Sequence, residues 1–139
     1  MQELTRQIEK AAPDAAPAAE LHSNLGIAYA GLSEAALAVA EGQKGIAIQP
    51  SSEDPFEGPS REEAMARIYA MLGDADHAIP ILERLVKFPA PTEIVPWHLR
   101  LDPTWDPIRN DRAFRSWLRK RSRKFQRNPS KTEATAGLD

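Results

Sequence analysis

Apolar residues recur every three or four positions along the first two thirds of the chain, and this is the period of an amphipathic α-helix. The first series consists of Leu21, Leu25, Ala28, Tyr29 and Leu32. It predicts a helix that follows Asp14 as its cap and ends near Leu32. Gly31 and Ser33 mark a turn, and Ser33 is expected to cap a second helix that closes at Pro50. The two helices form a predicted hairpin.

A second hairpin is predicted after a loop at residues 51–59, which holds two prolines, a glycine and three acids. Ser60 and Glu63 match the capping-box pattern Ser-x-x-Glu at the start of its first helix. The apolar series of its two helices are Ala64, Met65, Ile68, Tyr69 and Leu72, then Ala78, Ile79, Leu82, Leu85 and Val86. Asp74 is expected to cap the second of these helices, and Pro80 inside it predicts a kink.

Shorter helices are predicted on both sides of the hairpins. One covers residues 4–12, and another is expected at 93–99, where Pro96 interrupts it. Asp102 and Asp106 each stand directly before a proline, a residue suited to the first turn of a helix. Each of these two aspartates is therefore expected to cap a tight helical turn.

The last predicted helix is capped by Asn110 or Asp111 and carries Phe114, Trp117 and Leu118 on its apolar side. From about residue 128 the chain is small and polar, so we expect disorder there. The predicted organisation is an N-terminal helix at 1–15, two hairpins at 16–91, a C-terminal segment with a basic helix at 92–125 and a disordered tail at 126–139.

The two hairpins align with each other. Tyr29 and Tyr69 lie 40 positions apart, and Ala38 and Ala78 keep the same offset. The offset exceeds the 34-residue period of one helix-turn-helix repeat, and the loop at 51–59 accounts for the excess. Two further glycines of the first hairpin, Gly42 and Gly45, weaken their helix by about 1 kcal/mol each relative to alanine. Their presence predicts a close approach between neighbouring helices.

These residues resemble tetratricopeptide repeats. The first hairpin matches through Leu25, Gly26, Tyr29, Ala38 and Pro50. The second matches through Tyr69, the Leu72-Gly73-Asp74 turn, Ala78, Ile79 and Leu82. The sequence departs from the usual pattern at His22, at Gly42 and at Met65-Ala66. The resemblance implies an all-α, helical solenoid of about two repeats, and a protein that binds partners without catalysing a reaction.

The segment Leu101-Asp-Pro-Thr-Trp-Asp-Pro-Ile-Arg-Asn-Asp-Arg-Ala-Phe114 is similar to the end of many bacterial tetratricopeptide arrays. Such arrays often follow a protein kinase, a nucleotide cyclase or a winged-helix DNA-binding domain in larger regulators. The usual Asp-Pro-Arg-Phe motif reads Asp-Arg-Ala-Phe in this chain. The segment is rich in tryptophan, with Trp97, Trp105 and Trp117. We expect it to cap the open end of the helix stack, with Trp105 and Phe114 covering the apolar surface there.

The resemblance also implies a partner-binding groove, lined by the first helix of each repeat. The register places Ser23, Ile27, Ala30, Glu63, Arg67 and Ala70 in it. Lysines and asparagines that hold a peptide carboxylate in some members of the family are missing from these positions. A mixed polar and apolar peptide or helix of a partner protein is therefore the expected ligand.

The net charge of −2 conceals a strong asymmetry. Residues 1–108 carry a balance of −9, whereas residues 109–131 carry +9. The candidate binding residues within this arm are Arg115, Arg119, Lys120, Arg121, Arg123, Lys124 and Arg127. The arm is either a solvated helix end or a binding surface for an acidic partner, such as nucleic acid, an anionic membrane surface or another protein. Trp117 and Phe125, interleaved with the basic residues, favour a nucleic-acid or membrane-surface ligand as the alternative function.

Several classes of site are not expected. Cysteine is absent, which excludes thiol catalysis and thiolate metal sites. The histidines at 22, 77 and 98 lack metal-ligand spacing. No serine or carboxylate has the flanking pattern of an activated nucleophile or a general acid–base pair, and no glycine-rich phosphate loop occurs. We expect no catalytic residue, no cofactor and no metal.

The start of the chain lacks the basic and apolar regions of a signal peptide. No stretch approaches the roughly 20 apolar residues that span a bilayer. We expect a cytoplasmic protein, since a chain without cysteine suits a reducing compartment. Two repeats are fewer than the three usually needed for stability, so self-association or the extra helices are expected to compensate. Whether the chain is complete or the end of a longer array is left open.

Overall fold

A computed structural model describes residues 2–11, 15–87 and 96–127 of the chain, and the elements in these ranges are helical. They are α1 (Gln2–Ala11), α2 (Ala15–Gly31), α3 (Ala35–Ile48), α4 (Gly58–Met71), α5 (Ala75–Leu85), α6 (Pro96–Leu101), the 3₁₀ turn η1 (Pro103–Trp105), α7 (Asp106–Arg109) and α8 (Arg112–Arg127). The all-α prediction is confirmed for this part of the chain. The predicted cap Asp14 and the predicted tail from residue 128 lie outside the described residues. Because α8 ends at Arg127, residues 126 and 127 belong to this helix and not to the tail.

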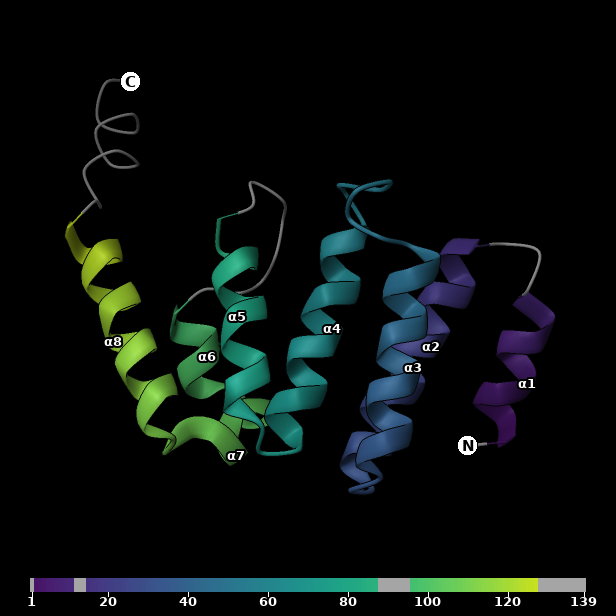
Figure 1. The fold of residues 1–139 in the computed structure, drawn as a ribbon, viewed down its shortest axis with the longest axis horizontal. Helices are drawn as coiled ribbons and strands as arrows, with labels where there is room; N and C mark the ends of the chain where they lie inside the picture. The colour runs from purple at the N-terminus through teal and green to yellow at the C-terminus, as the bar shows by residue number, and fades with distance from the viewer. Residues whose placement is uncertain (1, 12–14, 88–95, 128–139) are drawn as a thin grey trace.

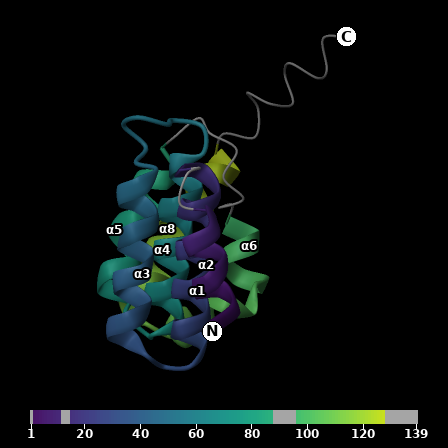
Figure 2. The ribbon, with the colours of Figure 1, turned by 90° about the vertical axis from the view of Figure 1, so that its right-hand side faces the viewer.

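The helices lie side by side in one row, with α1 at one end and α8 at the other (Figure 1). The helix pairs α2–α3 and α4–α5 form the two predicted hairpins, and both α2 and α3 contact α4. Seen from the α1 end, the hairpins stand one behind another (Figure 2). Contacts of α4 with α7 and η1, and of α5 with α8, join the C-terminal segment to the second hairpin.

The turns of the two hairpins have the same backbone structure. Ser33 (φ 61°) and Gly73 (φ 76°) both adopt the left-handed conformation that ends a helix. In each turn the next amide donates to a tyrosine carbonyl, from Glu34 to Tyr29 at 3.0 Å and from Asp74 to Tyr69 at 2.8 Å. The prediction that Ser33 caps α3 is therefore wrong, because Ser33 ends α2. Glu34 precedes α3 and makes no side-chain cap bond.

The other predicted hairpin caps have different outcomes. Asp74 caps α5 as predicted, since its carboxylate accepts a hydrogen bond from the His77 amide at 3.1 Å. The Ser60–Glu63 capping box is wrong, because α4 begins earlier, at Gly58. There the carboxylate of Asp54 accepts from the Glu57 amide at 2.9 Å and organises the turn. Proline is tolerated in a first turn, so Gly58-Pro59 can start the helix.

The helices of the first hairpin approach closely at glycines, as predicted. A Cβ built on Gly45 would lie 2.5 Å from Ser23 Oγ, and one on Gly42 would lie 2.6 Å from Met65 Sδ. Both distances are too short for real atoms. The two glycines therefore let α3 pack against α2 and α4, which compensates for their low helix propensity.

Two apolar clusters form the core of the described part of the chain. The first joins the second hairpin to the C-terminal segment and includes Leu82, Leu85, Leu99, Trp105, Ile108, Phe114, Trp117 and Leu118. The second, around Ala38, Met65 and Ile68, lies between the two hairpins. Tyr29 and Tyr69 are both half-buried and both pack against the second cluster. Pro80 lies inside α5, which continues through it to Leu85.

Candidate functional site

The predicted groove is largely part of the core. Ser23, Ala30 and Ala70 are buried, with 2%, 4% and 0% of their surface exposed, so the prediction that they line a partner groove is wrong. Ser23 faces Gly45 across the α2–α3 interface, and the two alanines belong to the apolar clusters. Ile27 is half-buried and packs against the cluster between the hairpins. The sequence register did not reveal this because it cannot show which side of a helix its neighbours cover.

The remaining groove candidates bind each other and the C-terminal segment. Arg67 donates to Glu63 Oε1 from Nε and Nη2, at 3.2 and 3.0 Å. Its Nη1 donates to Asp102 Oδ2 at 2.9 Å. The guanidinium carbon also lies 5.6 Å from the centroid of the Trp105 ring, within the range of a cation–π contact. The functional groups of Glu63 and Arg67 thus have intramolecular partners, which gives both residues a structural role.

The pKa values of this cluster agree with strong pairing. Burial lowers the pKa of Arg67, but the hydrogen bonds to Asp102 and Glu63 outweigh it and raise the pKa above its ordinary value. Burial likewise raises the pKa of Asp102, and the bonds from Thr104 and Arg67 reverse the effect and lower it. Both groups are therefore charged at neutral pH and attract each other.

Asp102 also organises the C-terminal segment. It caps η1 as predicted, because its carboxylate accepts from the Thr104 amide at 2.9 Å. Its carbonyl accepts from Arg109 Nη2 at 3.0 Å. The prediction that Asp106 caps a turn is wrong, since Asp106 lies within α7 and its carboxylate accepts from Arg109 Nε at 2.8 Å. Arg109 thus fastens η1 to α7.

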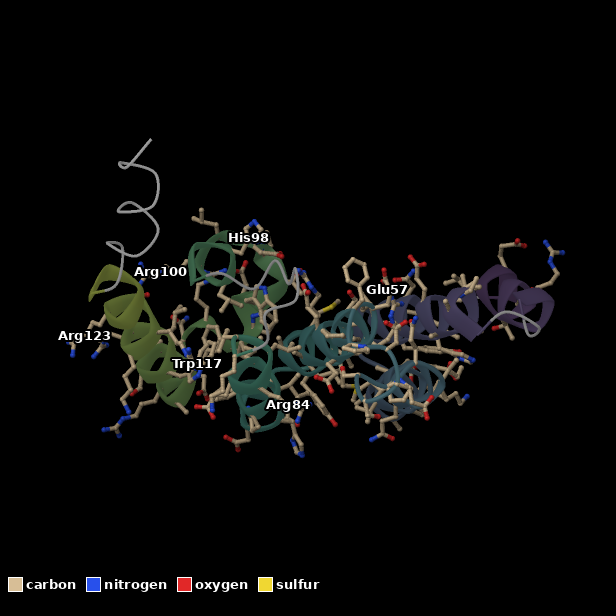
Figure 3. The ribbon with its side chains drawn as sticks, turned by 90° about the horizontal axis from the view of Figure 1, so that it is seen from above. Glu57, Arg84, His98, Arg100, Trp117 and Arg123 are labelled. Atoms are coloured by element: carbon tan, nitrogen blue, oxygen red, sulfur yellow. The ribbon has the colours of Figure 1, made fainter. Side chains whose placement is uncertain are left out.

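The last helix has an apolar and a basic face. Asp111 caps α8 as predicted, since its carboxylate accepts from the Phe114 amide at 3.0 Å. Phe114, Trp117 and Leu118 are buried against the second hairpin and the C-terminal segment. Figure 3 shows Trp117 on the side of α8 that faces the other helices and Arg123 on the outer side. The apolar face therefore holds α8 in place and turns its charged residues outward.

The exposed basic residues gather on the opposite side of α8. We define its basic face as Arg112, Arg115, Arg119, Lys120 and Arg123, all of them exposed. None of these five side chains forms an ion pair with another described residue. Arg121, also predicted as part of the basic arm, is half-buried. The side chains of Lys124, Phe125 and Arg127 lie outside the described residues.

A surface cavity of about 440 Å³ opens on this face, lined by Asn110, Arg112, Arg115, Ser116 and Arg119. Of these residues, the sequence had named only Arg115 and Arg119 as candidates for binding. The spacing of Arg112, Arg115 and Arg119 at i, i+3 and i+7, opposite Phe114 and Trp117, is the signal that would have added Arg112 to them. Three guanidinium groups, a hydroxyl and an amide supply only hydrogen-bond donors and neutral acceptors, a composition that suits an anion.

The buried polar groups elsewhere hold helices together. Glu41 Oε2 lies 2.6 Å from His22 Nδ1, and Glu41 Oε1 accepts from Lys44 Nζ at 2.6 Å. Burial raises the pKa of Glu41, but the bonds from Lys44 and His22 outweigh it and lower the pKa. His22 thus lies at the α2–α3 interface. His77, by contrast, is exposed, and its ring stacks on that of Tyr69 with 4.9 Å between the centroids.

Two further findings concern the described residues alone. In residues 2–11, 15–87 and 96–127, no three His, Cys, Asp or Glu side chains are grouped closely enough to hold a metal ion. Within the same part of the chain, each helix is too short or too polar to cross a lipid bilayer.

Comparison with known proteins gives no assignment. No protein-family model, no curated protein and no solved structure matches the chain.

Proposed function

We propose that this protein is a non-enzymatic helical-repeat module that binds an acidic partner through the basic face of α8. The observation that carries the proposal is the amphipathic placement of α8. Its apolar face is fixed in the core while its basic face is exposed and free of ion pairs with other described residues. An acidic ligand would relieve the repulsion among these like charges.

The helical body of this module is, in our proposal, a short tetratricopeptide-like array with a Trp-rich cap. The equivalence of the two turns supports the repeat, because Ser33 and Gly73 share one backbone conformation and one hydrogen-bond pattern. The burial of Trp105 and Phe114 in the same apolar cluster as α5 residues such as Leu82 supports the cap. Capping elements cover the apolar end of a stack that would otherwise face water.

The proposal is tested by measuring binding of labelled polyanions by fluorescence anisotropy. Two probes are used, an oligonucleotide of about 20 nucleotides and a polyglutamate of similar length, both at low salt, where electrostatic binding is strongest. The test variant is R115Q/R119Q, which removes two exposed charges and keeps a good helix former at each position. We expect the wild-type protein to bind at least one probe and the variant to bind it about tenfold more weakly.

A matched control removes two basic residues elsewhere. Arg84 and Lys87 are exposed and belong to the end of the second hairpin rather than to α8, and Arg84 is marked in Figure 3. The variant R84Q/K87Q has the same net charge as R115Q/R119Q, so an effect of net charge alone would be equal in both. Equal weakening in both variants, or no binding of either probe by the wild-type protein, would refute the proposed function.

Binding of a protein partner on the repeats themselves is a second candidate function. The repeated hairpin favours it, because stacked hairpins present extended surfaces that bind proteins. Cross-linking of a captured protein followed by mass spectrometry separates the two candidates. Cross-links to α2 and α4 that persist in R115Q/R119Q support binding on the repeats, whereas cross-links confined to α8 contradict it.

A further inference from the structure

We propose that the basic face of α8 binds the phosphate backbone of nucleic acid, duplex included, without reading its bases. This inference rests on the proposed function and names the partner class. It differs from a mode in which Phe114, Trp117 and Leu118 insert into a membrane or Trp117 stacks on bases. Four features of α8 carry the argument: its donors, its spacing, its buried apolar side and the burial of its tryptophan.

The donors on this face suit phosphate groups. Residues 112–127 contain six arginines, two lysines and no acid. Arginine binds phosphate with two parallel hydrogen bonds, which lysine does not. The cavity at the start of α8 is lined by three arginines together with Ser116 and Asn110. Arginine, serine and asparagine side chains are among the donors that proteins use to contact nucleic-acid phosphates.

The spacing of the charges suits a regular polyanion. Arg112, Arg115, Arg119 and Arg123 follow one another at intervals of three or four residues. At 1.5 Å per residue they stand about 4.5 to 6 Å apart along the helix axis. A DNA duplex presents one phosphate for about each 3.4 Å of axis on each strand. Because Phe114, Trp117 and Leu118 anchor α8 in the core, these arginines already share one exposed face before a ligand arrives, and more than one of them can contact phosphates at once.

The buried side of α8 excludes the usual mode of membrane binding. An interfacial helix inserts its apolar face among the lipid headgroups and acyl chains. In α8 that face is Phe114, Trp117 and Leu118, which are at most 9% exposed. These residues would have to leave the core before they could enter a membrane. Only an electrostatic contact with a membrane surface remains.

The same burial removes Trp117 from the binding surface. The sequence left two roles open for this ring, one among the basic residues of a binding arm and one in packing against the repeats, and the structure shows the packing role. Trp117 is 8% exposed and lies 6.1 Å from Phe114 between ring centroids, inside the core. A ring in that position is no stacking platform. Binding is therefore expected to use the backbone, which duplex and single strands share.

The experiment compares four probes with the full-length protein at one salt concentration. They are a DNA duplex of about 20 base pairs, one of its single strands, a polyglutamate of similar length, and vesicles in which about a third of the lipid is phosphatidylserine. We expect the duplex to bind at least as tightly as the single strand and about tenfold more tightly than polyglutamate. R115Q/R119Q is expected to weaken duplex binding about tenfold, and R84Q/K87Q less than twofold, with unchanged helicity by circular dichroism in both.

The outcomes separate this inference from the function on which it rests. Polyglutamate bound as tightly as the duplex would overturn the inference and indicate an acidic protein partner, with the proposed function intact. Vesicles bound more tightly than the duplex would overturn it in favour of a membrane surface. Binding of the single strand without the duplex would overturn backbone recognition. If no probe binds, the inference and the proposed function both fail.

Discussion

The guanidinium of Arg67 and the carboxylate of Asp102 lie 2.9 Å apart, although 35 residues separate them in the sequence. Arg67 comes from α4 and Asp102 caps η1, so this ion pair joins the second hairpin to the C-terminal segment. The same segment positions α8. The contact therefore links the stability of the helix row to the placement of the proposed binding surface.

Replacing Arg67 by alanine should lower the free energy of unfolding by about 2–3 kcal/mol. The substitution removes three hydrogen bonds and leaves two partly buried carboxylates without their partner. Urea denaturation measures the change. R84A is the control, because the exposed Arg84–Glu62 pair should contribute about 0.5 kcal/mol or less. Equal losses in the two variants would contradict the role given to Arg67.

The two turns predict that glycine is favoured at both equivalent positions, 33 and 73, because both have a left-handed backbone. S33G should stabilise the protein by about 0.5–1 kcal/mol, because Ser33 pays for a left-handed backbone that glycine adopts freely. G73A should destabilise it by about 1 kcal/mol for the same reason.

Gly31 supplies the control for these turn variants. It lies at the end of α2, where an added methyl would meet only Met71 Cε at an ordinary 3.7 Å. G31A should therefore be neutral or stabilising. Thermal unfolding of the three variants tests the assignment, and a loss in S33G equal to that in G73A would refute the equivalence of the turns.

The α2–α3 interface predicts coupling between Ser23 and Gly45. G45A should cost about 1–3 kcal/mol, because its methyl would overlap Ser23 Oγ at 2.5 Å and approach the Ala19 carbonyl at 3.0 Å. S23A alone should have little effect, since Ser23 Oγ is buried without a hydrogen bond among the described residues. In the double variant the loss from G45A should be smaller, because one of the two overlaps is gone. Additive effects in a double-mutant cycle would exclude this contact.

Acid should lower the free energy of unfolding in part because it protonates Glu41. Its pKa is lower in the folded protein than its ordinary value of 4.5, so its contribution to stability is present above that value. The contribution is lost as the pH falls through the folded-state pKa. E41Q should therefore lose less stability than the wild-type protein between about pH 6 and pH 3. E83Q, at an exposed carboxylate, is the control, and the same acid sensitivity in E41Q as in the wild-type protein would contradict the prediction.

The sequence predicted the positions of the hairpin helices because their apolar residues follow the helical period closely. It also predicted the contacts of Gly42 and Gly45, since a glycine within a helix needs a compensating close approach. Local rules failed where two of them compete. Ser33 suits a helix cap by type, yet the chain uses it in the left-handed position before the cap. The capping box predicted at Ser60 does not start α4, because a turn organised by Asp54 begins the helix earlier.

The site was harder to predict because it depends on contacts between distant segments. The ion pair between Arg67 and Asp102 cannot be seen in the sequence near either residue, and Arg67 was therefore predicted to be a groove residue. Ser23 and Ala70 were placed in a groove because the covered side of each helix depends on its neighbours. The charge of the sequence alone predicted the basic arm. Which of its residues face outward could be determined only from the structure, in which Trp117 is buried.

The most direct test of the central claim is the salt dependence of duplex DNA binding. Each phosphate neutralised by a basic residue contributes about −0.9 to the slope of log Kobs against log salt concentration. If Arg115 and Arg119 each contact a phosphate, the slope for R115Q/R119Q should be less steep than that of the wild-type protein by about 1.8, and that for R84Q/K87Q should be unchanged. A slope for R115Q/R119Q equal to that of the wild-type protein would contradict the claim that the basic face of α8 binds the backbone.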